Sequence, residues 1–326
     1  MTRRGLMAVG LAGVVCCGGQ VSSGGKAAGP RGVQTLAEVS GSTWLAVGSE
    51  TAYWAAGDTI ESCPLANCSN NLTVLAAGQA GVTGVVASGT TLYWSTSAGA
   101  VLSCPLSGCG GAPQPLVSGL PSLDDLAVDG ANAYWVSGAG SLVGSCPLDA
   151  CQAGAKTLAQ GEEAPLSIAV AGGVLAWTTA TAVRTCADPA CAAGPTTLAG
   201  NQNHPWDVVV DDQSIYWTSY GIGPIVACAE GGCTGSVSRC SLSGCGAGPV
   251  VLASSLNHPT GLVVDGTDTY WVTGDGLVLR CPIGGCAGTA VQLATGQDFA
   301  LGRVVAVTDS LVVWTSFGVG LLDVAK

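Results

Sequence analysis

Residues 126–159 contain the stretch of sequence that decides the fold. It consists of four pieces: Leu126-Ala127-Val128-Asp129-Gly130, Tyr134-Trp135-Val136, Cys146-Pro147-Leu148-Asp149-Ala150-Cys151 and Thr157-Leu158-Ala159. Apolar and β-branched residues dominate the pieces, and Asp-Gly or Gly-rich links separate them, which is typical of short strands joined by hairpin turns. The stretch therefore predicts a unit of four antiparallel strands, named A to D in chain order.

The same unit recurs along the chain, and one tryptophan marks each copy. The markers are Trp54, Trp94, Trp135, Trp177, Trp217, Trp271 and Trp314. Successive markers are 40, 41, 42, 40, 54 and 43 residues apart. A period of about 40 to 45 residues with four strands per copy is typical of a β-propeller blade. The sequence therefore predicts an all-β fold, a seven-bladed β-propeller of four-stranded antiparallel blades, as a single domain over residues 31–326.

The two ends of the chain are expected to share the last blade. The seventh unit has a strand A at 304–307, a strand B at 311–315 and a strand C near Leu321-Leu322, and it stops at Lys326 without a strand D. Residues 33–37, before the first unit, repeat the strand-D pattern of residues 291–294. We therefore expect the N-terminal strand to complete the last blade, which closes the ring and removes an open sheet edge.

The cysteines predict a set of local disulfides. Of the 16 cysteines, all but Cys16 and Cys17 fall into pairs with four residues between them: 63/68, 104/109, 146/151, 186/191, 228/233, 240/245 and 281/286. An even set with constant spacing in an exported chain indicates a disulfide framework, whereas zinc sites favour closer pairs that converge in space. In the longer fifth unit we favour the bonds Cys228–Cys233 and Cys240–Cys245; a nested arrangement, Cys228–Cys245 with Cys233–Cys240, is the alternative.

Residues 1–17 have the pattern of a signal peptide. Thr2-Arg3-Arg4 is basic, and the apolar run 5–15 is too short to span a bilayer. The cysteines that follow resemble, in their placement, a bacterial lipoprotein signal, with Cys17 (or Cys16) as the lipidated residue; simple secretion, with cleavage near residues 21–23, is the alternative. Residues 18–30 form a predicted flexible Gly/Ser linker. Both alternatives predict an exported protein, anchored at the cell envelope or secreted.

The composition limits the classes of function. The formal net charge is −11, which argues against nucleic acid as a partner because phosphates need a basic surface. The sequence contains no G-x-S-x-G elbow, Walker loop or H-E-x-x-H motif, and its Asp-Gly turns lack the dense acidic run of a calcium loop. We therefore expect no cofactor and no metal site, and we expect a monomer.

Two motifs resemble known propeller repeats. Tyr216-Trp217-Thr218, with a strand A that ends in Val-Asp, resembles the YWTD propellers of lipoprotein-receptor ectodomains. Asn203-His204-Pro205 and Asn257-His258-Pro259 are similar to the opening of NHL-type propeller repeats. The resemblance covers residues 31–326 and implies the propeller fold.

In a propeller, the D–A and B–C loops lie on one face and surround the mouth of the central channel. The D–A loops contribute Asp124, Asp125, Glu162, Glu163, His204, Trp206, Asp207, His258 and Arg303, and the B–C loops add Asp58, Tyr220 and Asp275. We expect this face to bind a ligand. Trp206 is the tryptophan expected to touch it, because the strand-B tryptophans are expected to pack between blades.

The only two histidines, His204 and His258, occupy equivalent positions in adjacent blades. Two imidazoles near carboxylates could bind a metal or act in general acid–base catalysis, and propeller lyases that inactivate cyclic antibiotics place their chemistry on this face. We favour turn chemistry before strand A instead. The reason is that the other units carry other residues at this position: Gly41, Gly81, Ser122, Ala164 and Leu301.

These observations favour a binding function over catalysis. We expect an exported cell-envelope propeller that binds a protein, peptide or glycan through the loops of one face. An enzyme, a lyase or hydrolase that uses His204 and His258, is the second hypothesis. An architectural surface protein without a tight ligand is the third.

Overall fold

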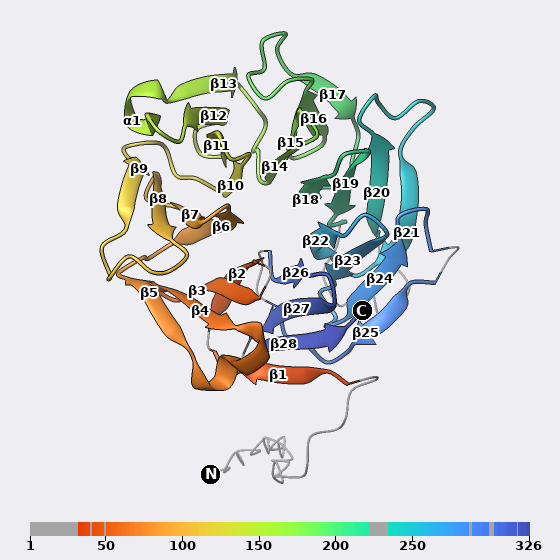
Figure 1. Cartoon of the computed structure of the whole chain (residues 1–326). Coiled ribbons are helices and arrows are strands. Elements are labelled where there is room, and N and C mark those ends of the chain that lie inside the picture. The colour runs from red at the N-terminus through yellow and green to blue at the C-terminus, as the bar shows by residue number, and fades with distance from the viewer. Residues whose placement is uncertain are drawn as a thin grey trace, which may run out of the picture.

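The computed structural model describes residues 32–39, 41–48, 50–221, 234–286, 289–299, 303–317 and 319–326. They form seven sheets of four antiparallel strands, arranged in a ring (Figure 1). The predicted seven-bladed β-propeller is therefore confirmed. The blades are numbered 1 to 7 in the chain order of their first strands.

Within each blade the first strand lies nearest the centre of the ring (Figure 1). Blades 1 to 3 are β2 (Ser42–Val47), β3 (Thr51–Ala56), β4 (Thr59–Pro64) and β5 (Thr73–Ala77); β6 (Val82–Ser88), β7 (Thr91–Thr96), β8 (Ala100–Pro105) and β9 (Gln114–Val117); β10 (Asp125–Val128), β11 (Asn132–Ser137), β12 (Leu142–Pro147) and β13 (Lys156–Gln160). Blades 4 and 5 are β14 (Ile168–Ala171), β15 (Val174–Thr178), β16 (Val183–Cys186) and β17 (Thr196–Ala199); β18 (Pro205–Val210), β19 (Ser214–Ser219), β20 (Gly235–Ser241) and β21 (Val250–Leu256). Blades 6 and 7 are β22 (Thr260–Val264), β23 (Asp268–Val272), β24 (Val278–Pro282) and β25 (Val291–Ala294); β26 (Val305–Val307), β27 (Leu311–Ser316), β28 (Gly320–Ala325) and β1 (Gln34–Ala37).

Among the residues that the structure describes, helical structure is confined to two short segments in the cysteine loops. These are the 3-10 helix η1 (Leu65–Asn70) and the helix α1 (Cys151–Gly154). Within the ranges that the structure describes, no helix is both long enough and apolar enough to cross a membrane.

The N-terminal strand closes the ring, as predicted. Strand β1 pairs antiparallel with β28, with Gln34 opposite Asp323 and Thr35 opposite Leu322. Figure 1 shows β1 at the outer edge of blade 7, beside the last strand of the chain. Gly320 has a φ of +123°, and a side chain there would overlap the carbonyl oxygen of Ala37, so this position requires glycine for the strands to approach.

The core lies between neighbouring blades and is built around the marker tryptophans. All seven have at most 2% of their surface exposed. Trp94 of blade 2, for example, packs against Tyr53, Ile60 and Leu75 of blade 1. Large aromatic side chains contribute most to such interfaces. The tryptophans therefore hold each blade to the one before it, as the repeat predicts.

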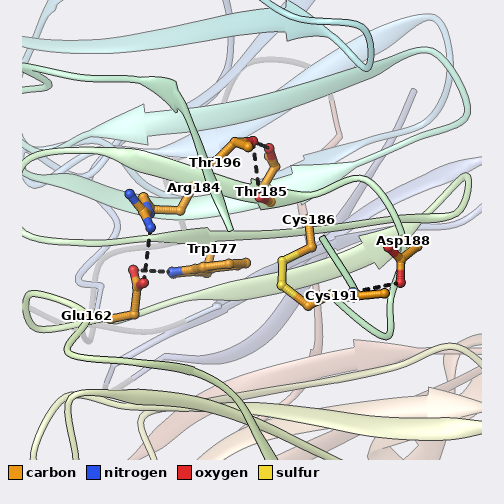
Figure 2. Close-up of a disulfide and its surroundings, with 9 residues drawn as sticks. Glu162, Trp177, Arg184, Thr185, Cys186, Asp188, Cys191 and Thr196 are labelled. Carbon is orange, nitrogen blue, oxygen red and sulfur yellow. Dashed lines mark hydrogen bonds and ion pairs between the residues drawn. A yellow bond between two sulfur atoms is a disulfide. The ribbon is translucent and has the colours of Figure 1, made fainter. Parts of the chain in front are cut away.

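Most of the buried indole N–H groups have a hydrogen-bond acceptor. In three blades the acceptor is a Gln or Glu 15 residues before the tryptophan: Trp94 donates to Gln79 at 3.0 Å, Trp177 to Glu162 at 2.9 Å and Trp217 to Gln202 at 3.0 Å. Trp314 donates to Gln297 at 3.0 Å and Trp54 to Glu61 at 3.1 Å. Figure 2 shows Glu162 between the indole of Trp177 and the guanidinium of Arg184.

Two indole N–H groups, those of Trp135 and Trp271, are buried and have no acceptor among the described residues. The residues 15 positions before them are Leu120 and Leu256. The backbone N–H of Leu120 donates to the carbonyl of Gly99 at 3.0 Å, just as that of Gln79 donates to the carbonyl of Asp58 at 2.6 Å. Leucine thus occupies the acceptor position but cannot accept a hydrogen bond.

Six of the seven predicted disulfides are present. They are Cys63–Cys68, Cys104–Cys109, Cys146–Cys151, Cys186–Cys191, Cys240–Cys245 and Cys281–Cys286, with Cα–Cα distances of 4.7 to 5.3 Å. Each bond closes the loop between the third and fourth strands of a blade, and Figure 2 shows one of them. The nested alternative in blade 5 is wrong, because Cys240 bonds to Cys245. Cys228 and Cys233 lie outside the described residues, as do Cys16, Cys17 and the rest of the predicted signal peptide and linker.

The ring closure can be tested by truncation. A chain that starts at residue 39 lacks β1 and leaves β28 as an open edge, so we expect its melting temperature to fall by on the order of 10 °C. A chain that starts at residue 31 keeps β1 and serves as the control. Thermal unfolding followed by circular dichroism measures both, and equal melting temperatures would contradict the closure.

The unpaired indole of Trp135 predicts a stabilising substitution. Leu120→Gln supplies the acceptor that blades 2 and 5 already have, so the free energy of unfolding should rise by about 1 kcal/mol. Leu116→Gln is the matched control. Leu116 packs against the same core cluster as Leu120, but it does not stand at the acceptor position 15 residues before the tryptophan. This control should destabilise the protein. Urea unfolding compares the two, and an equal loss in both would refute the acceptor role.

Candidate binding site at the mouth of the central channel

A pocket lies where the innermost strands of several blades begin. Its lining comes from blades 1, 3, 4, 5 and 7, and the empty space, including the open solvent at its mouth, is about 400 Å³. Since these blades are spread around the ring, the pocket lies at the mouth of the central channel. The lining residues are Trp44, Asp124, Asp125, Leu166, Ser167, Trp206, Asp207 and Arg303.

One position of the repeat links the inner strands of neighbouring blades. In blades 3, 4 and 5 it precedes the residue that pairs with the marker tryptophan, and it holds Asp125, Ser167 and Asp207. Each side chain accepts a hydrogen bond from a backbone N–H on the innermost strand of the next blade. The N–H of Ile168 donates to Asp125 Oδ2 at 3.0 Å, that of Val208 to Ser167 Oγ at 3.3 Å and that of Leu262 to Asp207 Oδ2 at 2.9 Å. These three contacts, the inter-blade clasps, join blades 3 to 6.

Arg303 extends from blade 7 across the channel to these clasps. Its Nε donates to Asp207 Oδ1 at 3.0 Å, and its Nη2 lies 3.2 Å from Asp125 Oδ2. The same Nη2 lies 3.1 Å from Ser167 Oγ and from two backbone carbonyl oxygens, those of Ile168 and Val208. The backbone carbonyl of Arg303 accepts the N–H of Leu45 in blade 1 at 2.8 Å. One residue of blade 7 thus contacts blades 1, 3, 4 and 5.

Burial shapes the electrostatics of this cluster. Asp125 and Asp207 are 1% and 3% exposed. Burial raises the pKa of Asp125 to about 6; the charge of Arg303 lowers it, and that of Asp207 raises it further. Burial alone would lower the pKa of Arg303, but the two aspartates outweigh that effect and raise it, so the guanidinium stays charged. Burial also raises the pKa of Asp124, although the N–H of Gly138 donates to its Oδ2 at 2.6 Å.

A row of aromatic rings adjoins the pocket at Trp206. The ring of Tyr220 stacks on Trp206 with 4.9 Å between centroids, and its centroid lies 4.3 Å from that of His258. His258 is 6% exposed, and its Nδ1 lies 2.7 Å from Oδ1 of Asn257. The row brings together three side chains that the sequence placed on one face.

The histidines occupy a turn position that requires an unusual backbone. His204 and His258 have φ values of +52° and +45°, and Gly41, Gly81 and Ala164 at the same repeat position have +69°, +70° and +46°. Glycine adopts this left-handed conformation most readily, and other residues adopt it mainly in turns. This shared geometry supports the turn interpretation of the two histidines. Among the described residues, no group of three or more His, Cys, Asp or Glu is arranged to hold a metal.

Other residues predicted for this face lie away from the pocket. Glu162 is buried and engages Trp177 and Arg184 within blade 4. Glu163 and Asp275 are exposed and accept hydrogen bonds from the hydroxyls of Thr181 and Thr273. Asp58 is also exposed, and its backbone carbonyl accepts a hydrogen bond from the N–H of Gln79. The structure thus brings Asp124, Asp125, Trp206, Asp207 and Arg303 together, with Tyr220 and His258 beside them.

Three lining residues, Trp44, Leu166 and Ser167, were missed by the sequence reasoning. A signal for two of them exists in the repeat. Trp44 and Ser167 stand at the position that holds Asp125 and Asp207, since Leu45 and Ile168 pair with the marker tryptophans of their blades. Aligning the units by their tryptophans would have placed all four residues at one level of the channel.

Comparison with known proteins identifies the fold. No protein-family model matches the sequence, and no curated protein is significantly similar to it. A catalytically inactive histidine variant of virginiamycin B lyase from Staphylococcus aureus with quinupristin has a TM-score of 0.70 at 11% identity, over 90% of this chain and 99% of that one. Hydrazine synthase of Kuenenia stuttgartiensis has a TM-score of 0.69 at 12% identity, and the match covers 89% of this chain and 96% of that one. A chain of the nidogen–laminin complex has a TM-score of 0.57 at 16% identity, and the match covers 75% of this chain and 92% of that one. At such identities the likeness shows the fold alone.

The raised pKa of Asp125 predicts a specific pH dependence. A carboxyl whose pKa rises on folding contributes stability below its unfolded value of 3.8, and this contribution is lost as pH rises through about 6. Asp125→Asn removes the titration. The free energy of unfolding of the wild type, relative to the variant, should therefore fall by about 2 kcal/mol between pH 4 and pH 7. Urea unfolding at four pH values measures it, and a constant difference between the two proteins would show that Asp125 does not titrate in this way.

Proposed function

We propose that this protein is an exported binding module of the cell envelope, which recognises a protein, peptide or glycan through the loops around its channel mouth. The observation that carries the proposal is the pocket lined by Trp44 and Trp206, continued by the ring of Tyr220 that stacks on Trp206. Half-buried tryptophan and tyrosine are the side chains that contribute most energy at binding surfaces.

The loops of this face are held in place, which favours recognition. Backbone hydrogen bonds tie D–A loops to B–C turns in blades 5 and 6: Tyr220 to His204 at 2.8 Å, Gly221 to Asn203 at 3.1 Å and Gly274 to Asn257 at 2.7 Å. The inter-blade clasps and Arg303 fix the inner strands beneath them. A surface already ordered before binding loses less entropy when a partner docks.

The contacts of the histidines favour binding over the enzyme hypothesis. His204 is exposed, whereas His258 is buried beneath the ring of Tyr220. Asp125 and Asp207 are engaged by backbone N–H groups and by Arg303, so a general base would have to break these contacts. The lyase or hydrolase hypothesis and the architectural hypothesis remain the outcomes against which binding is tested.

Export is part of the proposal. Six disulfides are compatible with an oxidising compartment outside the cytoplasm. The predicted leader would deliver the chain there, with Cys17 or Cys16 as the lipid anchor. The propeller would then stand at the envelope on the linker of residues 18–30, as a monomer.

Capture experiments test the proposal. We expect the purified protein to retain a partner from envelope extracts with or without a chelator, and Trp206→Ala to weaken binding at least about tenfold. Val251→Ala, an exposed change on β21 of the same blade, is the control and should bind like the wild type. A His204→Ala/His258→Ala double variant should still bind. Chelator-sensitive turnover that the double variant loses would support the enzyme, and the absence of any partner would support the architectural protein.

A further inference from the structure

The pocket at the channel mouth carries an excess of negative charge. Three carboxylates, Asp124, Asp125 and Asp207, line it with a single guanidinium, that of Arg303. Arg303 forms ion pairs with Asp125 at 3.2 Å and with Asp207 at 3.0 Å. Asp124 takes part in none of the ion pairs found among the described residues. It is therefore the carboxylate of this pocket that has a charge left to offer a ligand.

The walls beside Asp124 are apolar and aromatic. Trp44, Trp206 and Leu166 line the same small space, and all three are half-buried. Such walls bind poorly to a fully hydrated metal ion, which seeks oxygen ligands. They suit an organic cation, because the face of an indole ring attracts a positive charge and its apolar substituents pack against the ring.

The surroundings argue against an anionic ligand. The charge of Arg303 is matched by two carboxylates that also hold the inner strands together, so an anion would have to compete with them. The chain as a whole carries a net charge of −11, which repels anions and attracts cations toward the channel mouth.

We propose that this pocket binds an organic cation, an alkylated ammonium or a guanidinium on a small apolar body, between Trp44 and Trp206 with Asp124 as its counter-charge. This inference rests on the proposed function and names the chemistry that the binding face recognises. Eight residues line this small pocket, so a larger partner would insert one cationic group into it.

Choline chloride and its neutral isostere 3,3-dimethylbutan-1-ol test the proposal, because they share a shape and differ in charge. Isothermal titration calorimetry should show that the wild type binds choline at least about tenfold more tightly than the alcohol. Asp124→Asn keeps an oxygen for the N–H of Gly138 and should remove most of this preference. Trp206→Leu and Trp44→Leu should weaken choline binding by a similar factor, with unchanged melting temperatures to show that they fold.

Asp275→Asn is the matched control, since Asp275 is an exposed aspartate of the same face outside the pocket. It should bind choline like the wild type. Equal affinity for choline and the alcohol, no choline binding, or a choline affinity that Asp124→Asn leaves intact would overturn the cation site. Capture of an envelope partner that depends on Trp206, without any preference for choline, would overturn this inference while the proposed function stands.

Discussion

Each blade must bury both of its faces, because its second strand carries buried side chains on either side. In β15 and β19 every residue is buried, and in β11 all but the first are. A four-stranded sheet of this kind needs a neighbour on each side, and an open arc of blades would expose one apolar face at each end. Closing the ring removes both exposed faces, which is why the first and last strands of the chain share a sheet.

Polar contacts complete this arrangement at the centre. The tryptophans hold the blades together along their flanks, whereas Asp125, Ser167 and Asp207 join the inner strands. Arg303 supplies the positive charge that two buried carboxylates require. The contacts that join the inner strands thus also engage two of the three carboxylates at the mouth, and Asp124 takes part in none of the ion pairs among the described residues.

The fold was accessible from the sequence because its signals are periodic and local. The strand-B tryptophans, the C-x4-C loops and the strand-D likeness between residues 33–37 and 291–294 each repeat, and the structure confirms what they predict. The site was only partly accessible. The sequence placed Asp125, Asp207 and Arg303 on one face, and the structure brings them together in one pocket. No local pattern shows that a side chain of blade 7 reaches blades 3 to 5. Trp44 and Ser167 were missed because their role depends on neighbours across the ring.

The place of Arg303 in the chain also bears on how the molecule is assembled. Synthesis delivers Asp125, Ser167 and Asp207 long before Arg303, which arrives with the last blade. Until then the two aspartates lack their counter-ion, and burying unmatched charges is costly. The polar contacts at the axis are therefore complete only when the last blade is in place.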